Sequence, residues 1–468
     1  MKSKSARILV SLVAAVCGAL TLAFWVCLDT VDYRPYFLQP YYKETTARLE
    51  ASQQTNALMR GELEAGFGRA VLTPTLNSAQ VDPARGQFKS FPLAGYGSRL
   101  GHAATGVHDD VYVKAVAFRV ADRLGVMVGC DALIVPPAVT ELVLRQLEAN
   151  PGLRREQIYL SATHSHSSLG GWGKGRVEEE FAGTFQDGAS TWFAACIVAA
   201  VRDALTNLQP ASFGHGGFAQ PALVKNRLIG SLGKTDPEFS YLVVKQNNGQ
   251  LAVLGSYAAH ATVLPSSMLE FSADYPGAWQ RAVEKATGGL AVFLAGEVGS
   301  HAPNPRTRGL DGAERMGQTL AKELLDRLPV TPMTNSLAFD TIGLEVSLPS
   351  FNVRVTDNLR LRPWLASTLI HHSDRTIIQA FRFDSAVWIS TPCDFSGELA
   401  LGIKDFLRGR GFEAAITSFN GDYVGYVIPS RYYHLNGYEP RLMSFYGPYV
   451  PDYFDDLIRR MTAALAAN

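Results

Sequence analysis

One long stretch near the N-terminus contains no charged residue and is the strongest hydrophobic signal in the chain. It runs from Ile8 to Leu28 and follows the basic residues Lys2, Lys4 and Arg7. About 21 apolar residues, rising 1.5 Å each in a helix, span the roughly 30 Å hydrocarbon core of a bilayer. The pattern predicts a retained signal anchor, with the basic residues in the cytoplasm and everything after Asp29 outside. A cleaved signal peptide is the alternative interpretation.

Two stretches of different composition separate the apolar run from the globular part of the chain. Aromatic side chains typical of the headgroup level of a membrane follow the apolar run, at Tyr33, Tyr36, Phe37, Tyr41 and Tyr42. The stretch from Lys43 to Leu63 then predicts a helical spacer. We therefore expect an anchor over residues 1–28, a juxtamembrane spacer over 29–65, and one compact domain of about 400 residues over 66–468.

Within this domain, hydrophobic periodicity alternates between the two regular structures. Short apolar runs with β-branched residues predict strands near 111–120, 125–131, 157–160, 241–244 and 254–260. Apolar residues at helical spacing predict helices near 137–147, 192–208, 277–285, 314–328, 398–407 and 453–466. Strand, helix and strand in succession indicate an α/β fold.

Composition supports a folded protein and argues against nucleic acid as a partner. Hydrophobic residues make up 47% of the chain and charged residues 18%, which indicates a large core. The 43 basic and 43 acidic side chains balance, so no basic footprint for nucleic acid is present. Outside the apolar run, Cys130, Cys196 and Cys393 are widely spaced. We expect three buried free thiols, with one disulfide among them as the alternative.

Candidate chemistry begins at a pair of histidines, His164 and His166, which follow the strand predicted near 157–160. Residues two apart share one face of an extended strand, so both imidazoles would point into one space. Imidazole binds zinc and also acts as a general acid or base near neutral pH. A polar surface pair or a satisfied structural pair is the ordinary alternative.

A third histidine, His260, closes an apolar strand of small residues. A titratable side chain in such a place needs a polar partner, and a metal ion is one way to supply it. A core histidine bonded to the backbone is the alternative. His301, in a later loop, is expected to be exposed.

Longer motifs give these histidines a context. Thr163-His164-Ser165-His166-Ser167-Ser168-Leu169-Gly170-Gly171 resembles the Thr-His-Thr-His-Ser-Gly-Pro-Gly-Gly stretch of neutral, non-lysosomal ceramidases. Further similar segments are Gly66-Phe67-Gly68-Arg69-Ala70, Ser272-Ala273-Asp274, the loop 296–304, the strand end 388–398 and the tyrosine-rich series 420–448. The resemblance covers the family's N-terminal catalytic region nearly end to end. It does not extend to the immunoglobulin-like domain that follows in full-length members.

The resemblance implies a set of site residues. The zinc ligands would be His164, His260, Asp394 and Tyr426, and the catalytic side chains would be His166, Arg227 and Tyr438. Asp394 stands where the family has glutamate. Because its side chain is one methylene shorter, either its backbone must come closer to the metal or the coordination must weaken. Glu398, one helical turn further on, is either a substitute ligand or a group at the start of a helix.

The resemblance also implies a function. It indicates a mixed-sheet α/β zinc hydrolase that cleaves ceramide, or a related N-acyl lipid, to a fatty acid and a sphingoid base. His166 would protonate the leaving amine, Tyr438 would donate to the oxyanion, and Arg227 would hold the acyl oxygen or the product carboxylate. Tethered outside the cytoplasm, or in the periplasm of a Gram-negative bacterium, the domain would meet its lipid substrate at the membrane.

Two alternatives remain open. One is an amidase for a different N-acylated substrate, since acyl-chain selectivity depends on pocket shape. The other is a lipid-binding pseudoenzyme with a degenerate metal site. A serine hydrolase is disfavoured because the sequence has no Gly-x-Ser-x-Gly elbow. The oligomeric state does not follow from the sequence.

Overall fold

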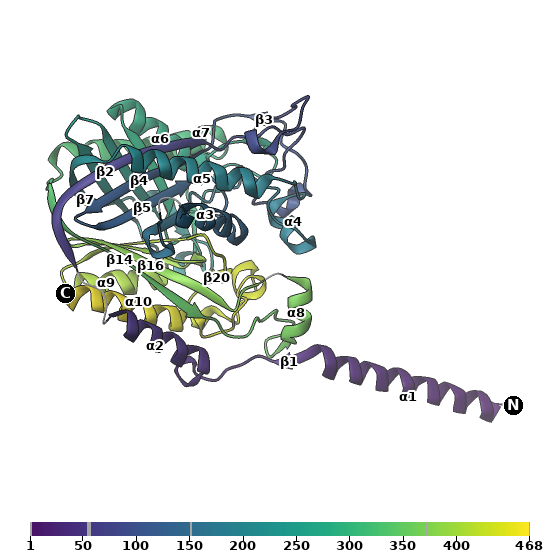
Figure 1. Ribbon diagram of the computed structural model, residues 1–468. Coiled ribbons are helices and arrows are strands. Elements are labelled where there is room, and N and C mark those ends of the chain that lie inside the picture. Colours follow the sequence, from purple (N-terminus) through teal and green to yellow (C-terminus); the bar gives the residue numbers. More distant parts are fainter. Residues whose placement is uncertain (1, 54–57, 150–151, 371, 468) are drawn as a thin grey trace.

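The computed structural model describes residues 2–53, 58–149, 152–370 and 372–467 (Figure 1). Helices are distributed along the whole chain. They are α1 (Lys2–Cys27), α2 (Pro40–Gln53), α3 (Pro137–Ala149), α4 (Arg176–Ala182), α5 (Ala189–Thr206), α6 (Asp274–Thr287), α7 (Leu310–Leu325), α8 (Pro363–Leu369), α9 (Gly397–Arg408) and α10 (Val450–Ala467).

Most strands belong to one mixed sheet of 12 strands. These are β2 (Met59–Val71), β4 (Tyr112–Val120), β5 (Arg123–Cys130), β6 (Ile158–Ala162), β7 (Gln209–Ala219), β9 (Glu238–Gln246), β10 (Leu251–Tyr257), β12 (Leu290–Ala295), β14 (Ser336–Ser347), β16 (Arg375–Phe383), β17 (Ala386–Ser390) and β19 (Glu413–Thr417). The main path is β12-β10-β9-β7-β2-β14-β16-β17-β19, and β4, β5 and β6 extend from β2. The expected mixed α/β fold is therefore observed.

The remaining strands form short two-stranded pairs. These are β1 (Leu28–Thr30) with β15 (Leu359–Leu361), β3 (Gly106–Val107) with β11 (Glu270–Phe271), β8 (Val224–Asn226) with β13 (His301–Pro303), and β18 (Asp394–Phe395) with β20 (Tyr426–Val427).

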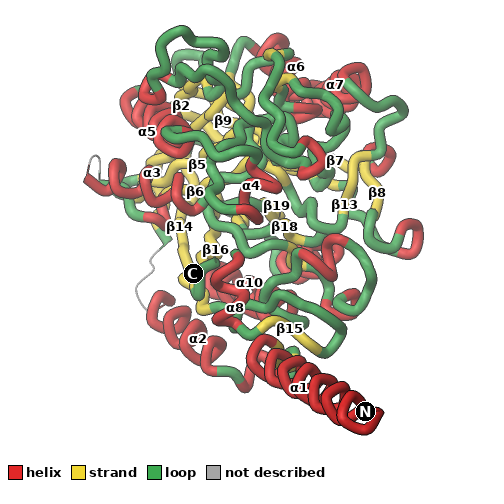
Figure 2. The backbone as a smooth tube through the Cα atoms, turned by 90° about the vertical axis from the view of Figure 1, so that its right-hand side faces the viewer, coloured by secondary structure: helices red, strands yellow, loops and turns green. Residues whose placement is uncertain are grey.

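The sheet curves around a central core and is covered by helices on its outer faces. Aromatic side chains that include Phe118, Tyr159, Phe339 and Phe381 fill the space between its inner faces. Helices α3 and α5 cover β4 and β5, α6 and α7 cover β9, β10 and β12, and α2, α9 and α10 cover β14, β16 and β17 (Figures 1 and 2). Each helix group thus buries its apolar face against one part of the sheet.

Parallel strand pairs determine where a site can form. The pairs β5–β6, β10–β12 and β17–β19 are parallel, whereas the other pairings of the large sheet are antiparallel. Hydrogen bonds across the core bring their carboxyl ends together: Ser161 Oγ donates to the carbonyl of Ser418 over 2.9 Å, and Ser418 N donates to that of Ala295 over 3.0 Å. Loops that leave such ends are the usual place for a binding site in an α/β sheet.

By length and composition, two described helices are apolar enough to cross a membrane. One is the segment Arg7–Cys27 of α1, none of which is buried; the other is α5, half of which is buried in the domain core. In Figure 1, α1 projects away from the rest of the molecule, whereas α5 lies on the sheet. The apolar segment predicted near the N-terminus is therefore helical.

Two details differ from the sequence-based expectations. The predicted helical spacer from Lys43 to Leu63 is α2 followed, after residues outside the described range, by the first residues of β2. The alternation of polar and buried side chains in β2 is what a strand requires, and the sequence analysis missed it. The three cysteines of the domain, Cys130, Cys196 and Cys393, are free and buried, as expected.

Close packing of β2 against α5 depends on a glycine. A Cβ atom on Gly68 would lie 2.1 Å from the carbonyl oxygen of Ala200 and 2.6 Å from the nitrogen of Ala204, both backbone atoms of α5. We expect Gly68→Ala to lower the free energy of unfolding by about 1–3 kcal/mol, because α5 must move away from the sheet. Urea unfolding of the full chain in detergent measures the change.

Gly61 on the same strand is the matched control. A Cβ atom there would have its nearest neighbour, Val120 Cγ1, at an ordinary contact distance of 3.5 Å. Gly61→Ala should change the free energy of unfolding by no more than about 0.5 kcal/mol. Equal effects at the two positions would contradict this account of the β2–α5 contact.

Candidate active site

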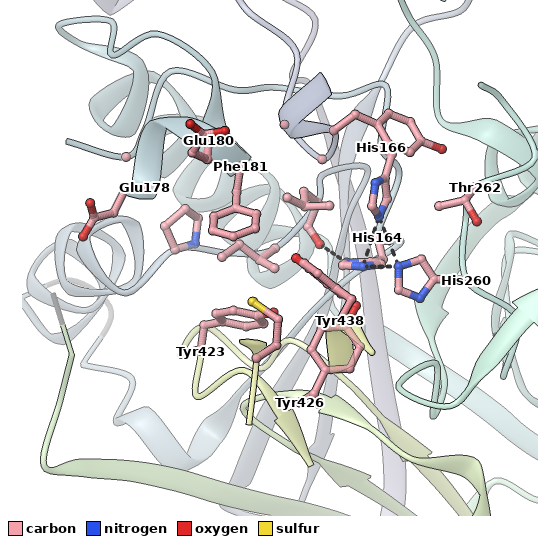
Figure 3. Close-up of a pocket in the computed structure, with 18 of the residues that line it drawn as sticks. His164, His166, Glu178, Glu180, Phe181, His260, Thr262, Tyr423, Tyr426 and Tyr438 are labelled. Atoms are coloured by element: carbon pink, nitrogen blue, oxygen red, sulfur yellow. Dashed lines mark hydrogen bonds between the residues drawn. The ribbon is translucent and has the colours of Figure 1, made fainter. Parts of the chain in front are cut away.

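Three imidazoles converge at the carboxyl ends of the parallel strands (Figure 3). His164 follows β6, and His260 follows β10. The Nε2 atom of His164 lies 2.8 Å from that of His260 and 3.3 Å from that of His166, and the His166 and His260 Nε2 atoms are 3.1 Å apart. His164 and His260 are buried, so the cluster is enclosed by protein on most sides.

The backbone turns sharply at His164, which has a left-handed φ of 61°. Strand β6 already ends at Ala162, so the prediction that the two histidines share a strand face is wrong. They meet because the loop after β6 turns back on itself. The His164 ring stacks on Phe419, with centroids 4.1 Å apart, and Phe419 has a left-handed φ of 67° just beyond β19. Such conformations are costly for residues other than glycine and often occur at functional sites.

Backbone carbonyls fix which nitrogen of two rings carries the proton. His164 Nδ1 lies 2.7 Å from the carbonyl oxygen of Leu133, and His260 Nδ1 lies 3.4 Å from that of Val298. Each Nδ1 must therefore donate, which leaves a lone pair on each Nε2. Two lone pairs that face each other across 2.8 Å repel unless a cation or a proton lies between them.

A carboxylate completes this arrangement. Strands β18 and β20 are parallel and place Asp394 directly beside Tyr426. Asp394 Oδ1 lies 3.6 Å from His164 Nε2, and it has no hydrogen-bond partner among the described residues. Asp394 Oδ2 accepts a hydrogen bond from the hydroxyl of Tyr423 over 2.8 Å, which holds the carboxylate in place.

This donor set fits a divalent metal ion. Two imidazole lone pairs and an unpaired, fully buried carboxylate oxygen point toward one space, and the donor types are those that zinc accepts. Carbonyls that orient the opposite ring nitrogens are the usual support for metal-binding histidines. Residues His164, His166 and His260 could thus bind a metal, and Asp394 lies beside one of them, His164.

Burial sets the charges of the cluster. It lowers the pKa of His164 to about 3 and takes the pKa values of His166 and His260 well below the ordinary 6.5. All three imidazoles are neutral at pH 7, which is the form that binds metal. Burial also raises the pKa of Asp394 to about 7, although the nearby Arg227 guanidinium acts in the opposite direction.

His166 differs from the other two histidines in its surroundings. Among the described residues, no ring–carbonyl contact as short as those of His164 and His260 holds its Nδ1, although the backbone of Gly95 lies beside the ring and favours its protonated form. Its backbone is held by the buried Arg99, whose guanidinium donates to the carbonyl of His166 and, over 3.2 Å, to Ser167 Oγ. Gly95, with φ of 106°, allows the close approach, because a Cβ there would lie 2.6 Å from the His166 ring.

Arg227 lies beside the predicted tyrosine ligand. Its Nη2 donates to the hydroxyl oxygen of Tyr426 over 2.9 Å, and its Nε lies 3.0 Å from Glu439 Oε1. Burial raises the pKa of Tyr426 well above 10, as does the Asp394 carboxylate, while Arg227 opposes both effects. The guanidinium is thus placed to stabilise negative charge on the Tyr426 oxygen.

Tyr438 stands at the opening of the site. Its ring packs edge-on against that of Tyr426 with centroids 5.8 Å apart, and 43% of its surface is exposed. Both tyrosines and the three histidines line a cavity of about 1350 Å³. Figure 3 shows Tyr438 pointing toward the histidines from the other side of the cavity. Six of the seven predicted site residues therefore line this cavity, and the seventh, Asp394, lies beside His164 without being part of the cavity lining.

The loop after β12 contacts the histidine cluster and is itself held in place by buried charged side chains. Glu297 and Asp236 both lie 2.7 Å from Lys404 Nζ, and all three side chains are buried. This ion cluster fixes the loop whose next residue, Val298, faces His260. His301 is buried here and packs against Gly397, so the expectation of an exposed side chain is wrong. Short-range patterns gave no sign that this loop would be covered.

Glu398 is a group at the start of a helix, which is one of the two roles expected for it. It lies in the first turn of α9, whose N-cap Ser396 accepts a hydrogen bond from the Glu398 backbone. Its carboxylate pairs with Arg431 and accepts a hydrogen bond from Asn226 Nδ2 over 2.8 Å. With these partners it holds surrounding loops together, and it is not a substitute for Asp394.

Four residues that support the site escaped the sequence analysis: Arg99, Phe419, Tyr423 and Glu439. Each acts through a partner distant in sequence, so no periodic pattern could reveal it. The only available signals were an arginine next to the Gly95-Tyr96-Gly97 turn and a tyrosine three residues before Tyr426.

Comparison with known proteins gives the site a context. The family model described as neutral/alkaline non-lysosomal ceramidase, N-terminal, matches residues 81–304. A curated neutral ceramidase from Pseudomonas aeruginosa is 26% identical over 238 residues, which is 47% of this chain and 35% of that protein. The chain thus aligns with about a third of the relative's length.

Solved structures agree with the fold. The neutral ceramidase of Pseudomonas aeruginosa superimposes with a TM-score of 0.71 at 19% identity, covering 88% of this chain and 75% of that one. A structure described as ceramidase complexed with C2 gives a TM-score of 0.71 at 19% identity, with 87% of this chain covered. The likeness therefore extends well beyond the segment matched by the family model.

The raised pKa of Asp394 predicts how metal affinity depends on pH. Below pH 7 this carboxyl holds a proton that a metal must displace, whereas the imidazoles are already neutral. The apparent affinity for Zn²⁺ should fall by about tenfold per pH unit from pH 7 to pH 5 and level off above pH 7. Calorimetric titration of the metal-free protein at several pH values measures this slope.

Asp394→Asn is the matched variant, since it keeps the side-chain size and removes the titrating group. We expect weaker zinc binding with almost no pH dependence in the same range. A variant that keeps the slope of the wild type would show that another group releases the proton.

Proposed function

The chain belongs to the neutral/alkaline non-lysosomal ceramidase family, and on this basis we propose that it is a zinc-dependent amidase for ceramide or a closely related N-acyl lipid. The products would be a fatty acid and a sphingoid base, as for an N-acylsphingosine amidohydrolase. The proposal draws on the family relationship and on the chemistry of the side chains that line the cavity.

The observation that carries the proposal is the shape and lining of the cavity. Its volume of about 1350 Å³ exceeds the range of about 300–1000 Å³ usual for small-molecule sites. Side chains such as Ile134, Trp172, Phe181 and Phe445 line it, while the histidines and Arg227 lie together at one place. Charged side chains such as Glu178 and Glu180 line the side of the cavity away from the histidines (Figure 3). A large cavity with apolar walls and a cluster of histidines suits a lipid whose reactive amide must reach that cluster.

We assign His164, His260, Asp394 and Tyr426 as the residues that would hold Zn²⁺. A zinc ion at such a site acts as a Lewis acid toward the amide carbonyl and makes water nucleophilic near neutral pH. The shorter aspartate is compensated by its position in β18, next to Tyr426, and by the hydrogen bond from Tyr423. Arg227 favours the ionised form of the Tyr426 phenol.

The other side chains handle protons and the acyl group. His166 Nε2 lies 3.3 Å from His164 Nε2 and 3.1 Å from His260 Nε2, so this imidazole would stand beside the reacting amide and carry a proton to the leaving amine. The Tyr438 hydroxyl would donate to the developing oxyanion, and such a donor is worth about 10²–10³ in rate at comparable sites. Arg227 retains donors for the acyl oxygen or the product carboxylate.

The proposed location follows from α1. As a signal anchor it would tether the domain outside the cytoplasm, or in the periplasm of a Gram-negative bacterium. Ceramide stays in the bilayer because it hardly dissolves, so an anchored enzyme would remain beside its substrate.

The direct test uses the full chain in detergent micelles that contain ceramide. We expect release of fatty acid and sphingoid base in equal amounts, loss of activity on chelation, and recovery with Zn²⁺. Ceramide that binds without cleavage in the zinc-loaded protein would contradict the proposal and favour a lipid-binding role. Cleavage of another N-acylated amine alone would keep the chemistry and exclude ceramide as the substrate.

The different roles proposed for His164, a metal ligand, and His166, a proton carrier, give a second prediction. His166→Ala should keep one zinc per chain and lower kcat by about 10²–10⁴, because only the proton carrier is lost. His164→Ala should lose the metal as well as the activity. Metal analysis and kinetics on the same preparations measure both effects. Loss of zinc in His166→Ala would instead show that this residue is a ligand.

A further inference from the structure

The apolar helix α1 is joined to the rest of the molecule without a free linker. Its last residue, Cys27, is followed at once by β1, which pairs antiparallel with β15. Arg362 N donates to the carbonyl of Cys27 over 2.8 Å, and Arg362 Nε donates to that of Trp25 over 3.0 Å. The end of α1 is therefore hydrogen-bonded to the domain, and its direction relative to the domain is fixed.

More contacts strengthen this junction. Val31 N donates to the carbonyl of Asn358 over 3.0 Å, and the Tyr33 hydroxyl donates to that of Asp357 over 2.7 Å. Arg441 pairs with the Asp357 carboxylate over 2.6 Å. Arg441 belongs to the single-turn π-helix Tyr438–Leu442, so the segment that carries Tyr438 is tied to the same junction.

Several apolar side chains around the junction expose about half of their surface. Trp364 and Leu369 of α8 are 55% and 53% exposed, and Leu442 of the π-helix is 62% exposed. Val355, in the loop before β15, is 44% exposed. We call these four residues the mouth face. Figure 1 shows α8 and β1, and Figure 2 shows α8 and β15, beside the inner end of α1.

The mouth face adjoins the cavity. Ile370 ends α8 and lines the cavity wall, as does His372. Tyr438 lines it from the π-helix. The end of α1, the exposed apolar residues and the cavity wall therefore lie next to one another in the structure.

Bilayer dimensions limit where the mouth face can lie. The 21 residues of Arg7–Cys27 cover about 31 Å, so a spanning helix ends at the boundary of the hydrocarbon core. Arg362, bonded to that end, lies at the same depth.

We propose that the mouth face is a membrane-docking surface, inserted into the headgroup region of the bilayer that α1 spans. Trp364 has the amphipathic ring that favours this depth. Leu369, Leu442 and Val355 leave apolar surface in contact with water if they stay outside the bilayer, which is unfavourable. The cavity then opens onto the membrane, and an acylated lipid moves past Ile370 to the histidines without crossing water. The route rests on the proposed amidase activity, whereas the docking depth rests on the proposed anchor role of α1.

The depth of Trp364 tests the surface independently of catalysis. The full chain, which contains 6 tryptophans, is placed in lipid nanodiscs, and the fluorescence of Trp364→Phe is subtracted from that of the wild type. The difference signal belongs to Trp364. We expect quenching by lipids brominated along their acyl chains and protection from aqueous iodide. Quenching by iodide and not by brominated lipid would overturn the proposal.

Activity tests the route. Trp364→Ser combined with Leu369→Ser should lower hydrolysis of long-chain ceramide in the nanodisc by about fivefold or more, because less apolar surface holds the mouth in the bilayer. Hydrolysis of a short-chain, water-dispersed ceramide should change by less than about twofold. An equal loss on both substrates, or no loss on either, would overturn the route.

The matched control removes exposed apolar residues elsewhere. Leu232 and Val330 are 88% and 76% exposed and belong neither to the junction nor to the mouth face. Leu232→Ser with Val330→Ser should leave the hydrolysis of both substrates unchanged. A wild-type protein that cleaves neither substrate would refute the proposed function, and the depth of Trp364 would still decide whether the face is docked.

Discussion

The structure depends on one electrostatic constraint, the meeting of two imidazole lone pairs and an unpaired carboxylate oxygen inside the protein. Carbonyls of Leu133 and Val298 orient His164 and His260 so that their Nε2 atoms face each other at 2.8 Å. Asp394 Oδ1 completes the group without a hydrogen-bond partner among the described residues. Such an arrangement is costly for a protein alone, because burial penalises unpaired polar groups, and it becomes favourable when a cation is bound. The family relationship and the cavity agree with this interpretation.

Much of the surrounding fold holds this group in place. The parallel pairs β5–β6, β10–β12 and β17–β19 direct the loops toward one another, and the buried ion cluster of Lys404, Glu297 and Asp236 supports the loop under His260. Arg99 holds the backbone at His166 by hydrogen bonds to carbonyl groups. Burial lowers the pKa of this guanidinium to about 10, against an opposite effect of Tyr96. These groups stabilise a local geometry that neighbouring residues would not adopt by themselves.

The sequence predicted the regular elements better than the site. Helices such as α3 and α7 carry apolar residues at helical spacing, and their periodicity was sufficient to place them within a few residues. The relation between His164 and His166 was misjudged, since a left-handed turn has no periodic signature. Ligands spread from His164 to Tyr426 meet only through long-range strand pairing, which local patterns do not encode; the family resemblance proposed them. The burial of His301 and the strand that begins at Met59 also result from tertiary packing.

Helix α1 and the candidate site are connected through the same set of contacts, and this connection would matter if the membrane supplies the substrate. The junction at Arg362 sets the orientation of the domain, and Tyr438 lies on a segment tied to that junction. All of this presupposes a metal at the histidines. Anomalous diffraction at the zinc edge, on crystals of the zinc-loaded protein, tests that claim most directly. The account predicts one strong peak between His164 Nε2, His260 Nε2 and Asp394 Oδ1. A peak elsewhere, or none at these atoms in fully loaded protein, would contradict it.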